Sequence, residues 1–197
     1  MADTVGRPRG GWLVLGTIAG MLACADAIAQ PTPVDSQAAL AATGTVVRTA
    51  SIAHVRGIRT GKRDGAVLVE ESRHACPTVQ RLLDALQQSD VVVLVEVCDR
   101  VLNRTGHLTF IGTSHGTRWL RITIDGGNRQ VQQAAWLAHE LQHAVEVALA
   151  HDVKDVEGLR RLYARIGTAR GDGQFETDAA VAAGKQALRE VYEAGRR

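Results

Sequence analysis

The feature that most constrains the fold is a long amphipathic segment, residues 131–149, that contains neither proline nor glycine. Successive helical residues turn by about 100°, which divides this segment into an apolar arc and a polar side. The apolar arc holds Val131, Ala134, Leu137, Ala138, Leu141, Ala144, Val145, Ala148 and Leu149. The polar side holds Gln132, Trp136, His139, Glu140, His143 and Glu146. The pattern predicts a helix with one face in a core, capped by Asn128 after a Gly126-Gly127 turn.

The polar side carries the pattern His139-Glu140-x-x-His143. A spacing of four puts both imidazoles on one helix face, where they can share a zinc ion. Glu140 points to one side of this pair and can reach a water bound to the metal. We therefore expect His139 and His143 to bind zinc and Glu140 to act as a general base. The alternative is a core helix whose histidines are satisfied by hydrogen bonds, but two histidines and a glutamate on one stripe favour the metal.

A catalytic zinc usually has three protein ligands and one position for water, so a third ligand is needed. Glycine and a third histidine at positions 146 and 149 would suit one arrangement, but the chain has Glu146 and Leu149. The best candidate is Glu176, 33 positions after His143. Asp178 is the reserve, followed by Glu146, His151 and Asp152. Glu176 and Asp178 could instead be first-turn acids that stabilise a helix dipole.

A final helix is expected from about Phe175 to Ala194, with Glu176 on it. The face of that helix continues as Ala180, Ala183 and Ala187, whose small side chains would let two helices approach closely. A carboxylate on one helix could then reach a metal on its neighbour. Glu146 could also act outside the ligand set, as a partner to one imidazole.

The remaining elements predict an α+β domain with a small sheet. Residues 45–58 can hold a strand, and residues 59–65 are expected to be a polar loop. Pro77 should begin a helix, and residues 91–97 form a β-branched run typical of a buried strand. Residues 107–112 and 117–125 should form a β-hairpin, with Leu120, Ile122 and Ile124 facing the core and Trp119, Arg121 and Thr123 facing outward. A helix is expected at 156–166, then a loop at 167–173.

The N-terminal segment predicts export. Arg7 and Arg9 precede an apolar run (residues 12–25) and the small residues Ala27 and Ala29, as in a signal peptide spanning residues 1–29. A lipoprotein anchored through Cys24 is the alternative. Residues 30–44, rich in Pro, Ala, Ser, Thr and Gln, are expected to be a flexible leader, and residues 45–197 a single domain. No apolar run is long enough for a stable membrane span.

Charge and cysteine content limit the partners. The formal net charge is +2, and the predicted signal peptide holds two charges of each sign, so the balance survives its removal. This argues against nucleic acid or a membrane surface as the main partner, and it leaves oligomeric state open. Cys76 and Cys98 could form a disulfide in an oxidising compartment or could both be buried thiols.

These residues resemble the zincin metallopeptidases, of the gluzincin type in which a glutamate on a downstream helix completes the site. The resemblance covers about 106–189 and extends to small exported bacterial proteins with a HELQHAVE segment (here 139–146) and an ETDAA-like segment (here 176–180). Gluzincins often place an aspartate four residues after the ligand glutamate, where this chain has Ala180. The resemblance implies a minimal zincin-like domain, in which a β-hairpin packs on the motif helix.

By the same resemblance, the activity is hydrolysis of a peptide or protein substrate, with zinc bound by His139, His143 and Glu176 and with Glu140 as general base. The strand 118–125 would be the sheet edge that pairs with an extended substrate. Tyr163 could donate to the oxyanion or could be a packing residue.

Two other functions fit the same residues. One is a non-catalytic exported module in which His151 or Asp152 closes a structural zinc site with a fourth ligand. The other is a scaffold without metal. Glu140 favours the enzyme, because a structural zinc needs no base beside it.

Overall fold

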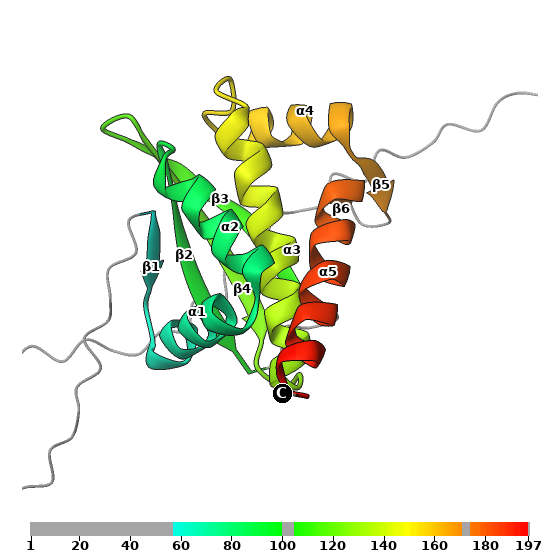
Figure 1. The fold of residues 1–197 in the computed structure, drawn as a ribbon. Helices are drawn as coiled ribbons and strands as arrows, with labels where there is room; N and C mark the ends of the chain where they lie inside the picture. The colour runs from blue at the N-terminus through cyan, green and yellow to red at the C-terminus, as the bar shows by residue number, and fades with distance from the viewer. Residues whose placement is uncertain (1–56, 100–104, 171–173, 197) are drawn as a thin grey trace, which may run out of the picture. The chain divides into compact units, whose positions relative to one another are not determined.

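The computed structural model describes residues 57–99, 105–170 and 174–196 (Figure 1). These residues form five helices, a four-stranded mixed sheet and a two-stranded sheet, which confirms the α+β prediction. The predicted signal peptide, Cys24 and the flexible leader lie outside the described residues. Within the described ranges, no helix combines the length and the apolar character that a bilayer crossing requires.

The main sheet contains β1 (Ile58–Thr60), β2 (Val91–Cys98), β4 (Thr117–Asp125) and β3 (Gly106–Ser114), in that spatial order. The strands β1 and β4 both run parallel to β2, whereas β3 runs antiparallel to β4. The predicted strand at 91–97 is confirmed, and alternate residues Val91, Val93 and Val95 are fully buried.

The predicted hairpin is confirmed as β3 and β4, joined at His115 and Gly116. Both residues have positive φ (49° and 78°), as a tight two-residue hairpin turn requires. The prediction that strand 118–125 is a sheet edge is wrong, because β4 lies between β2 and β3. Among the described strands, β3 forms the edge on that side. Leu120, Ile122 and Ile124 are buried as predicted, but Thr123 is buried too.

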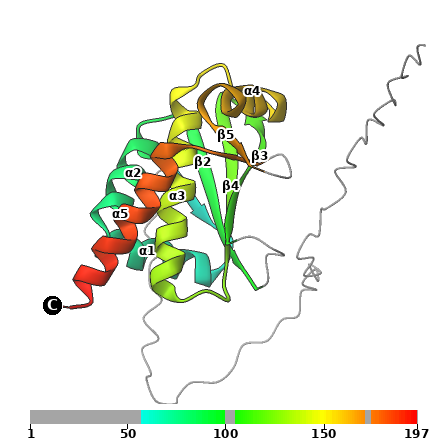
Figure 2. The same ribbon diagram turned by 90° about the vertical axis from the view of Figure 1, so that its right-hand side faces the viewer.

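The helices are α1 (Arg63–Ala75), α2 (Pro77–Gln87), α3 (Gln130–Leu149), α4 (Val156–Ile166) and α5 (Asp178–Ala194). In Figure 2, α1, α2, α3 and α5 lie on one side of the sheet, and α4 lies near the C-terminal end of α3. The motif helix α3 packs its apolar arc against β4 and α2, and α5 packs on α3. The N-cap of α3 is Arg129 rather than the predicted Asn128. The sheet and α2 cover α3 on one side and α5 covers it on another, so polar residues of α3 can be buried as well.

The polar loop predicted at 59–65 is wrong, because β1 and the start of α1 occupy it. Gly65 explains the error, since it suggests a loop but here lies on the first turn of α1. A Cβ at this position would lie 2.6 Å from the carbonyl oxygen of Val95, so only glycine lets α1 approach β2 so closely.

The final helix also differs from its prediction. It begins at Asp178, after Thr177 as N-cap, and not near Phe175. The preceding residues form a hairpin of β5 (Thr168–Arg170) and β6 (Gln174–Glu176), where a loop was expected at 167–173. Glu176 therefore lies at the end of a strand rather than on a helix. Ala180, Ala183 and Ala187 are buried on α5, as the small-residue face predicted.

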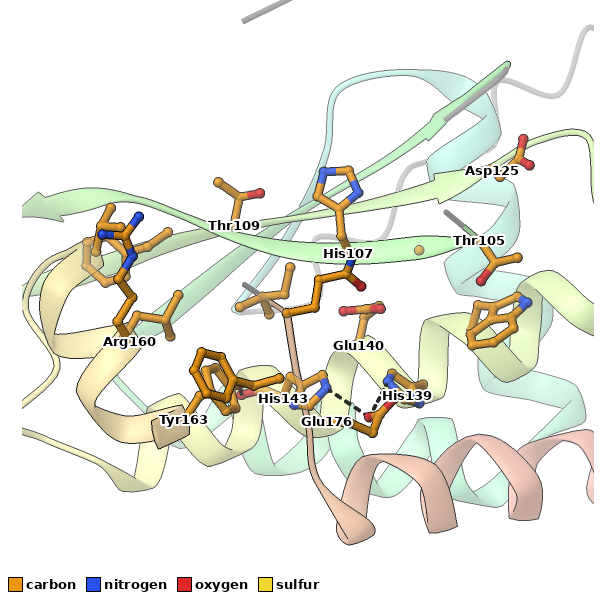
Figure 3. Close-up of a pocket in the computed structure, with 18 residues that line it drawn as sticks. Thr105, His107, Thr109, Asp125, His139, Glu140, His143, Arg160, Tyr163 and Glu176 are labelled. Atoms are coloured by element: carbon orange, nitrogen blue, oxygen red, sulfur yellow. Dashed lines mark hydrogen bonds and ion pairs between the residues drawn. The ribbon is translucent and has the colours of Figure 1, made fainter. Parts of the chain in front are cut away.

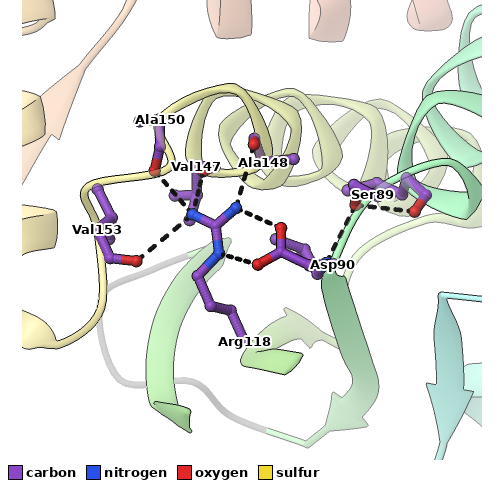
Figure 4. Close-up of polar contacts among 9 residues, drawn as sticks. Ser89, Asp90, Arg118, Val147, Ala148, Ala150 and Val153 are labelled. Carbon is purple, nitrogen blue, oxygen red and sulfur yellow. Dashed lines mark hydrogen bonds and ion pairs between the residues drawn. The ribbon is translucent and has the colours of Figure 1, made fainter. Parts of the chain in front are cut away.

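A buried arginine fixes the C-terminal end of α3 (Figure 4). The guanidinium of Arg118, from the inward face of β4, is fully buried and forms a bidentate pair with Asp90 at 2.6 and 2.8 Å. It also donates to main-chain oxygens of Val147, Ala148, Ala150 and Val153. The last carbonyls of a helix have no partner within the helix, and Arg118 satisfies several of them at once. Sheet and motif helix are thereby joined through one side chain.

Candidate metal centre

Three side chains from two distant parts of the sequence converge beside α3 (Figure 3). His139 and His143 come from adjacent turns of α3, and Glu176 comes from the end of β6. The Oε1 atom of Glu176 lies 3.1 Å from Nε2 of His139 and 3.6 Å from Nε2 of His143. One donor atom from each residue lies within 4.8 Å of the others. The three residues predicted to bind a metal are thus brought together.

The chemistry of these donors fits a bound cation. Oε1 of Glu176 is buried and accepts no hydrogen bond, and an unsatisfied buried carboxylate oxygen is costly. A cation between this oxygen and two imidazole nitrogens would satisfy it. Two histidines and a carboxylate form a donor set of the kind zinc takes when a fourth position stays open.

The imidazole of His143 is held by a partner on its own helix. Its Nδ1 lies 2.9 Å from Oε2 of Glu146, which leaves Nε2 directed at Glu176. The other oxygen of Glu146 accepts a hydrogen bond of 2.7 Å from the hydroxyl of Thr177. Glu146 therefore lies outside the donor group and orients a histidine, one of the two roles expected for it. Thr177 was not predicted; an N-cap threonine directly after the candidate ligand was its only signal in the sequence.

His139 is fixed by close packing with α5. A Cβ built on Gly184 would lie 3.3 Å from the carbonyl oxygen of Ala135 and 3.4 Å from Cβ of His139. Trp136 packs edge-on against the His139 ring, with 5.8 Å between centroids. The absence of a side chain at Gly184 thus lets α5 approach α3 at the level of the first histidine.

Burial controls the protonation of both histidines, which are 8% and 6% exposed. Burial is the main reason why the pKa of His139 is lowered, although the Glu176 carboxylate acts against it. Burial also acts to lower the pKa of His143, but the hydrogen bond that its Nδ1 donates to Glu146 and the nearby carboxylates outweigh this effect and raise that pKa. A metal binds the neutral form of imidazole, so the shift of His139 favours metal binding and the shift of His143 opposes it.

Glu140 lies next to the donor group and is 5% exposed. Burial raises its pKa to about 7, although the charge of His143 acts in the opposite direction. Its carboxylate faces β3, where a Cβ on Gly106 would lie 3.2 Å from Oε1. A carboxyl group with a pKa near neutrality can both accept and donate a proton at physiological pH.

These residues line a cleft of about 680 Å³ between β3, α3, α4 and the β6 strand. Tyr163 lines the cleft as well, but its hydroxyl donates a 3.1 Å hydrogen bond to the main-chain oxygen of His143. Its ring stacks on Phe175, with centroids 6.5 Å apart. Burial raises the pKa of the phenol, so the proton stays on it. The packing role considered for Tyr163 therefore describes what the residue does in this structure.

The other candidate ligands do not reach the site. Asp178 is exposed in the first turn of α5, and His151 and Asp152 are exposed in the turn after α3. Within the described residues, the donor group therefore consists of His139, His143 and Glu176. Comparisons with family models, with curated proteins and with solved structures found no match for this chain.

Proposed function

We propose that this chain is an exported zinc-dependent peptidase of the zincin type. The observation that carries the proposal is the convergence of Glu176 with His139 and His143, with Glu140 beside them in the same cleft. The predicted signal peptide supports export. A zinc ion bound there would supply a water of lowered pKa and a positive charge that polarises the substrate carbonyl.

The chain's own residues would carry the proton transfer. Glu140, with a pKa of about 7, would take a proton from the attacking water and pass it to the departing amine. Its burial keeps bulk water from competing for that proton. Glu146 would hold His143 in the orientation that presents Nε2, as it does in this structure.

The substrate would lie along β3 as an additional strand. Residues 105–110 line the cleft beside Glu140, and β3 is the sheet edge on that side of the described fold. An extended peptide that hydrogen-bonds to this edge would place its backbone across the three candidate ligands. Gly106 would let that backbone come close to Glu140, because a side chain at this position would contact the carboxylate.

The metal content of four purified proteins tests the ligands. We expect about one zinc per chain, measured by elemental analysis, in wild type and in Glu140→Gln. Glu176→Ala should lose most of it, because two histidines remain. Asp178→Ala is the matched control, since that acid is exposed two residues away. Zinc retained in Glu176→Ala would contradict the ligand assignment.

Cleavage of a peptide library tests the proposed peptidase activity. Wild type loaded with zinc should cleave members of a random peptide library, and Glu140→Gln should cleave none while keeping its zinc. Equal cleavage by the two proteins would contradict the role of Glu140. Full zinc occupancy without any cleavage would instead favour the non-catalytic module.

A further inference from the structure

Charged side chains are distributed unevenly along the cleft. Figure 3 shows Arg160 at one end and Asp125 at the other, with Glu140 and Glu176 between them. Among the described residues that line the cleft, Arg160 is the one lysine or arginine. Apart from the candidate metal centre, a substrate that lies along the cleft therefore meets a permanently charged basic side chain at the α4 end only.

The position of Arg160 follows from the geometry of α4. Val156, Leu159, Arg160 and Tyr163 are spaced i, i+3, i+4 and i+7, which places them on one face of the helix. All four line the cleft. The hydrogen bond from Tyr163 to His143 fixes the rotation of this face toward the metal centre. The guanidinium of Arg160 rises from it toward β3 (Figure 3).

The guanidinium is available to a ligand. Arg160 forms an ion pair with Glu157, with 3.8 Å between Nη1 and Oε2, and the two side chains are 58% and 62% exposed. An exposed pair at this distance contributes little, so its replacement by a ligand carboxylate costs little. The guanidinium presents donors in a planar fork that matches a carboxylate.

Apolar side chains share the cleft with this charge. Val156 and Leu159 lie on the same face of α4 as Arg160; Val156 is 47% exposed, and Leu159 packs against the core. Phe110, from the middle of β3, is buried and lines the same cleft. A side chain with an aliphatic stem and a terminal carboxylate would cover the apolar surface and meet the guanidinium.

We propose that Arg160 and its apolar surroundings form a subsite for a carboxylate of the substrate, an inference that rests on the proposed peptidase function. Tyr163, which contacts His143, lies one helical turn from Arg160, or about 5–6 Å. An extended peptide advances about 3.3 Å per residue. The subsite therefore selects a carboxylate about two residues from the cleaved bond. That carboxylate belongs either to a Glu or Asp side chain or to the C-terminus of the peptide.

A defined peptide pool tests this subsite. Each position of a scaffold peptide is changed in turn between Glu and Gln, and each peptide is made with a free and with an amidated C-terminus. Zinc-loaded wild type, Arg160→Glu and Arg161→Glu are compared, with cleavage sites read by mass spectrometry. Arg161 is the matched control, because it lies next to Arg160 and 3.9 Å from the same Glu157 but does not line the cleft.

We expect wild type and Arg161→Glu to prefer Glu over Gln by about tenfold at one position near the cleaved bond. The preference should disappear in Arg160→Glu and weaken at high salt. If the preference follows the free C-terminus instead, the subsite binds the terminal carboxylate. Cleavage without either preference, or a preference that Arg160→Glu leaves unchanged, overturns the subsite but not the peptidase.

If wild type cleaves no peptide, the peptidase function fails and binding decides the subsite. The same peptides are then titrated against zinc-loaded Glu140→Gln with and without Arg160→Glu. Tighter binding of carboxylate-bearing peptides that depends on Arg160 supports the subsite. Equal binding of all peptides, or no binding, overturns it.

Discussion

Thr177 and Glu146 are joined by a 2.7 Å hydrogen bond from Oγ1 to Oε1, which links the N-terminus of α5 to the residue that holds His143. Thr177 also directly follows Glu176 and caps α5 by accepting from the N–H of Ala180. One hydroxyl thus connects two candidate ligands that lie 33 positions apart in the sequence. The relative position of a carboxylate and an imidazole depends on it.

Thr177→Val should weaken zinc binding about 10- to 100-fold, measured by competition with a chelator, because the support of His143 is lost. Thr177→Ser keeps the hydroxyl and should bind zinc as wild type does. Asp155→Ala is the control, because it removes the N-cap of α4 without touching Glu146. If Asp155→Ala weakens zinc binding as much as Thr177→Val does, the effect comes from loss of a helix cap and not from loss of the hydrogen bond between Thr177 and Glu146.

Gly184→Val should separate α5 from α3 and displace His139. Even the Cβ atom of the new side chain would lie only 3.3 Å from the carbonyl oxygen of Ala135, and the two methyl groups of valine need further space. Overpacking of this kind costs about 1–3 kcal/mol of folding stability. The apo protein should therefore melt at a lower temperature, and zinc affinity should fall as well. Gly195→Ala is the control, since its nearest contact would be at 3.6 Å. Unchanged zinc affinity in a folded Gly184→Val would show that the close approach does not position His139.

Asp90→Asn should lower the free energy of unfolding by about 3 kcal/mol, because it leaves the buried guanidinium of Arg118 without its counter-ion. Glu96→Gln is the control, since it breaks the more exposed pair with Arg121 and should cost about 0–1 kcal/mol. Urea unfolding of the three proteins at neutral pH measures both values.

The loss of stability caused by Asp90→Asn should depend on pH. The hydrogen bonds from Arg118 lower the pKa of Asp90 in the folded protein. Stability from this pair is therefore complete above the unfolded-state pKa of about 3.9 and is lost as pH falls through the lower folded-state pKa. The difference between wild type and Asp90→Asn should be constant from pH 7 to about 5 and should shrink below pH 4. A difference that stays constant in acid would contradict the ion pair.

Cys76 should not react with a thiol reagent in the folded protein. It is fully buried, and burial together with the hydrogen bond to Glu190 raises its pKa to about 12. The test uses Cys24→Ser combined with Cys98→Ser, so that Cys76 is the only thiol. Modification should follow unfolding by urea, and rapid modification of the native protein would contradict the burial. No disulfide joins Cys76 and Cys98 in this structure, and of the two expected buried thiols Cys76 is buried whereas Cys98 is half-buried.

Local patterns in the sequence predicted several of the long elements, although no helix was expected where α1 lies. The helix 156–166 has the expected bounds, and the motif helix begins one residue earlier than its apolar pattern suggested. In both cases the periodicity comes from the burial of one face, which the sequence records directly. The three candidate ligands also followed from chemistry, since two histidines on one helix need a third donor.

Long-range packing was less predictable. The position of β4 inside the sheet depends on its parallel pairing with β2, and nothing within residues 117–125 specifies that partner. The start of α5 was placed too early because Glu176 is a good helix former, whereas Thr177 ends the strand and caps the helix. Arg118 was overlooked as a core residue because only the fold brings Asp90 and the end of α3 together around it.

The edge that β3 forms among the described strands also has a consequence for self-association. Main-chain groups that could pair with a substrate could equally pair with a second copy of the chain, which is the usual route to edge-to-edge aggregation. The register of β3 shifts between Phe110 and Gly112, which interrupts the ladder at a β-bulge. The bulge thereby divides the edge into two shorter regular stretches, and residues 106–110 form the one that lies beside Glu140. The bulge thus shortens the surface on which unwanted strands could assemble and leaves the stretch beside the cleft intact.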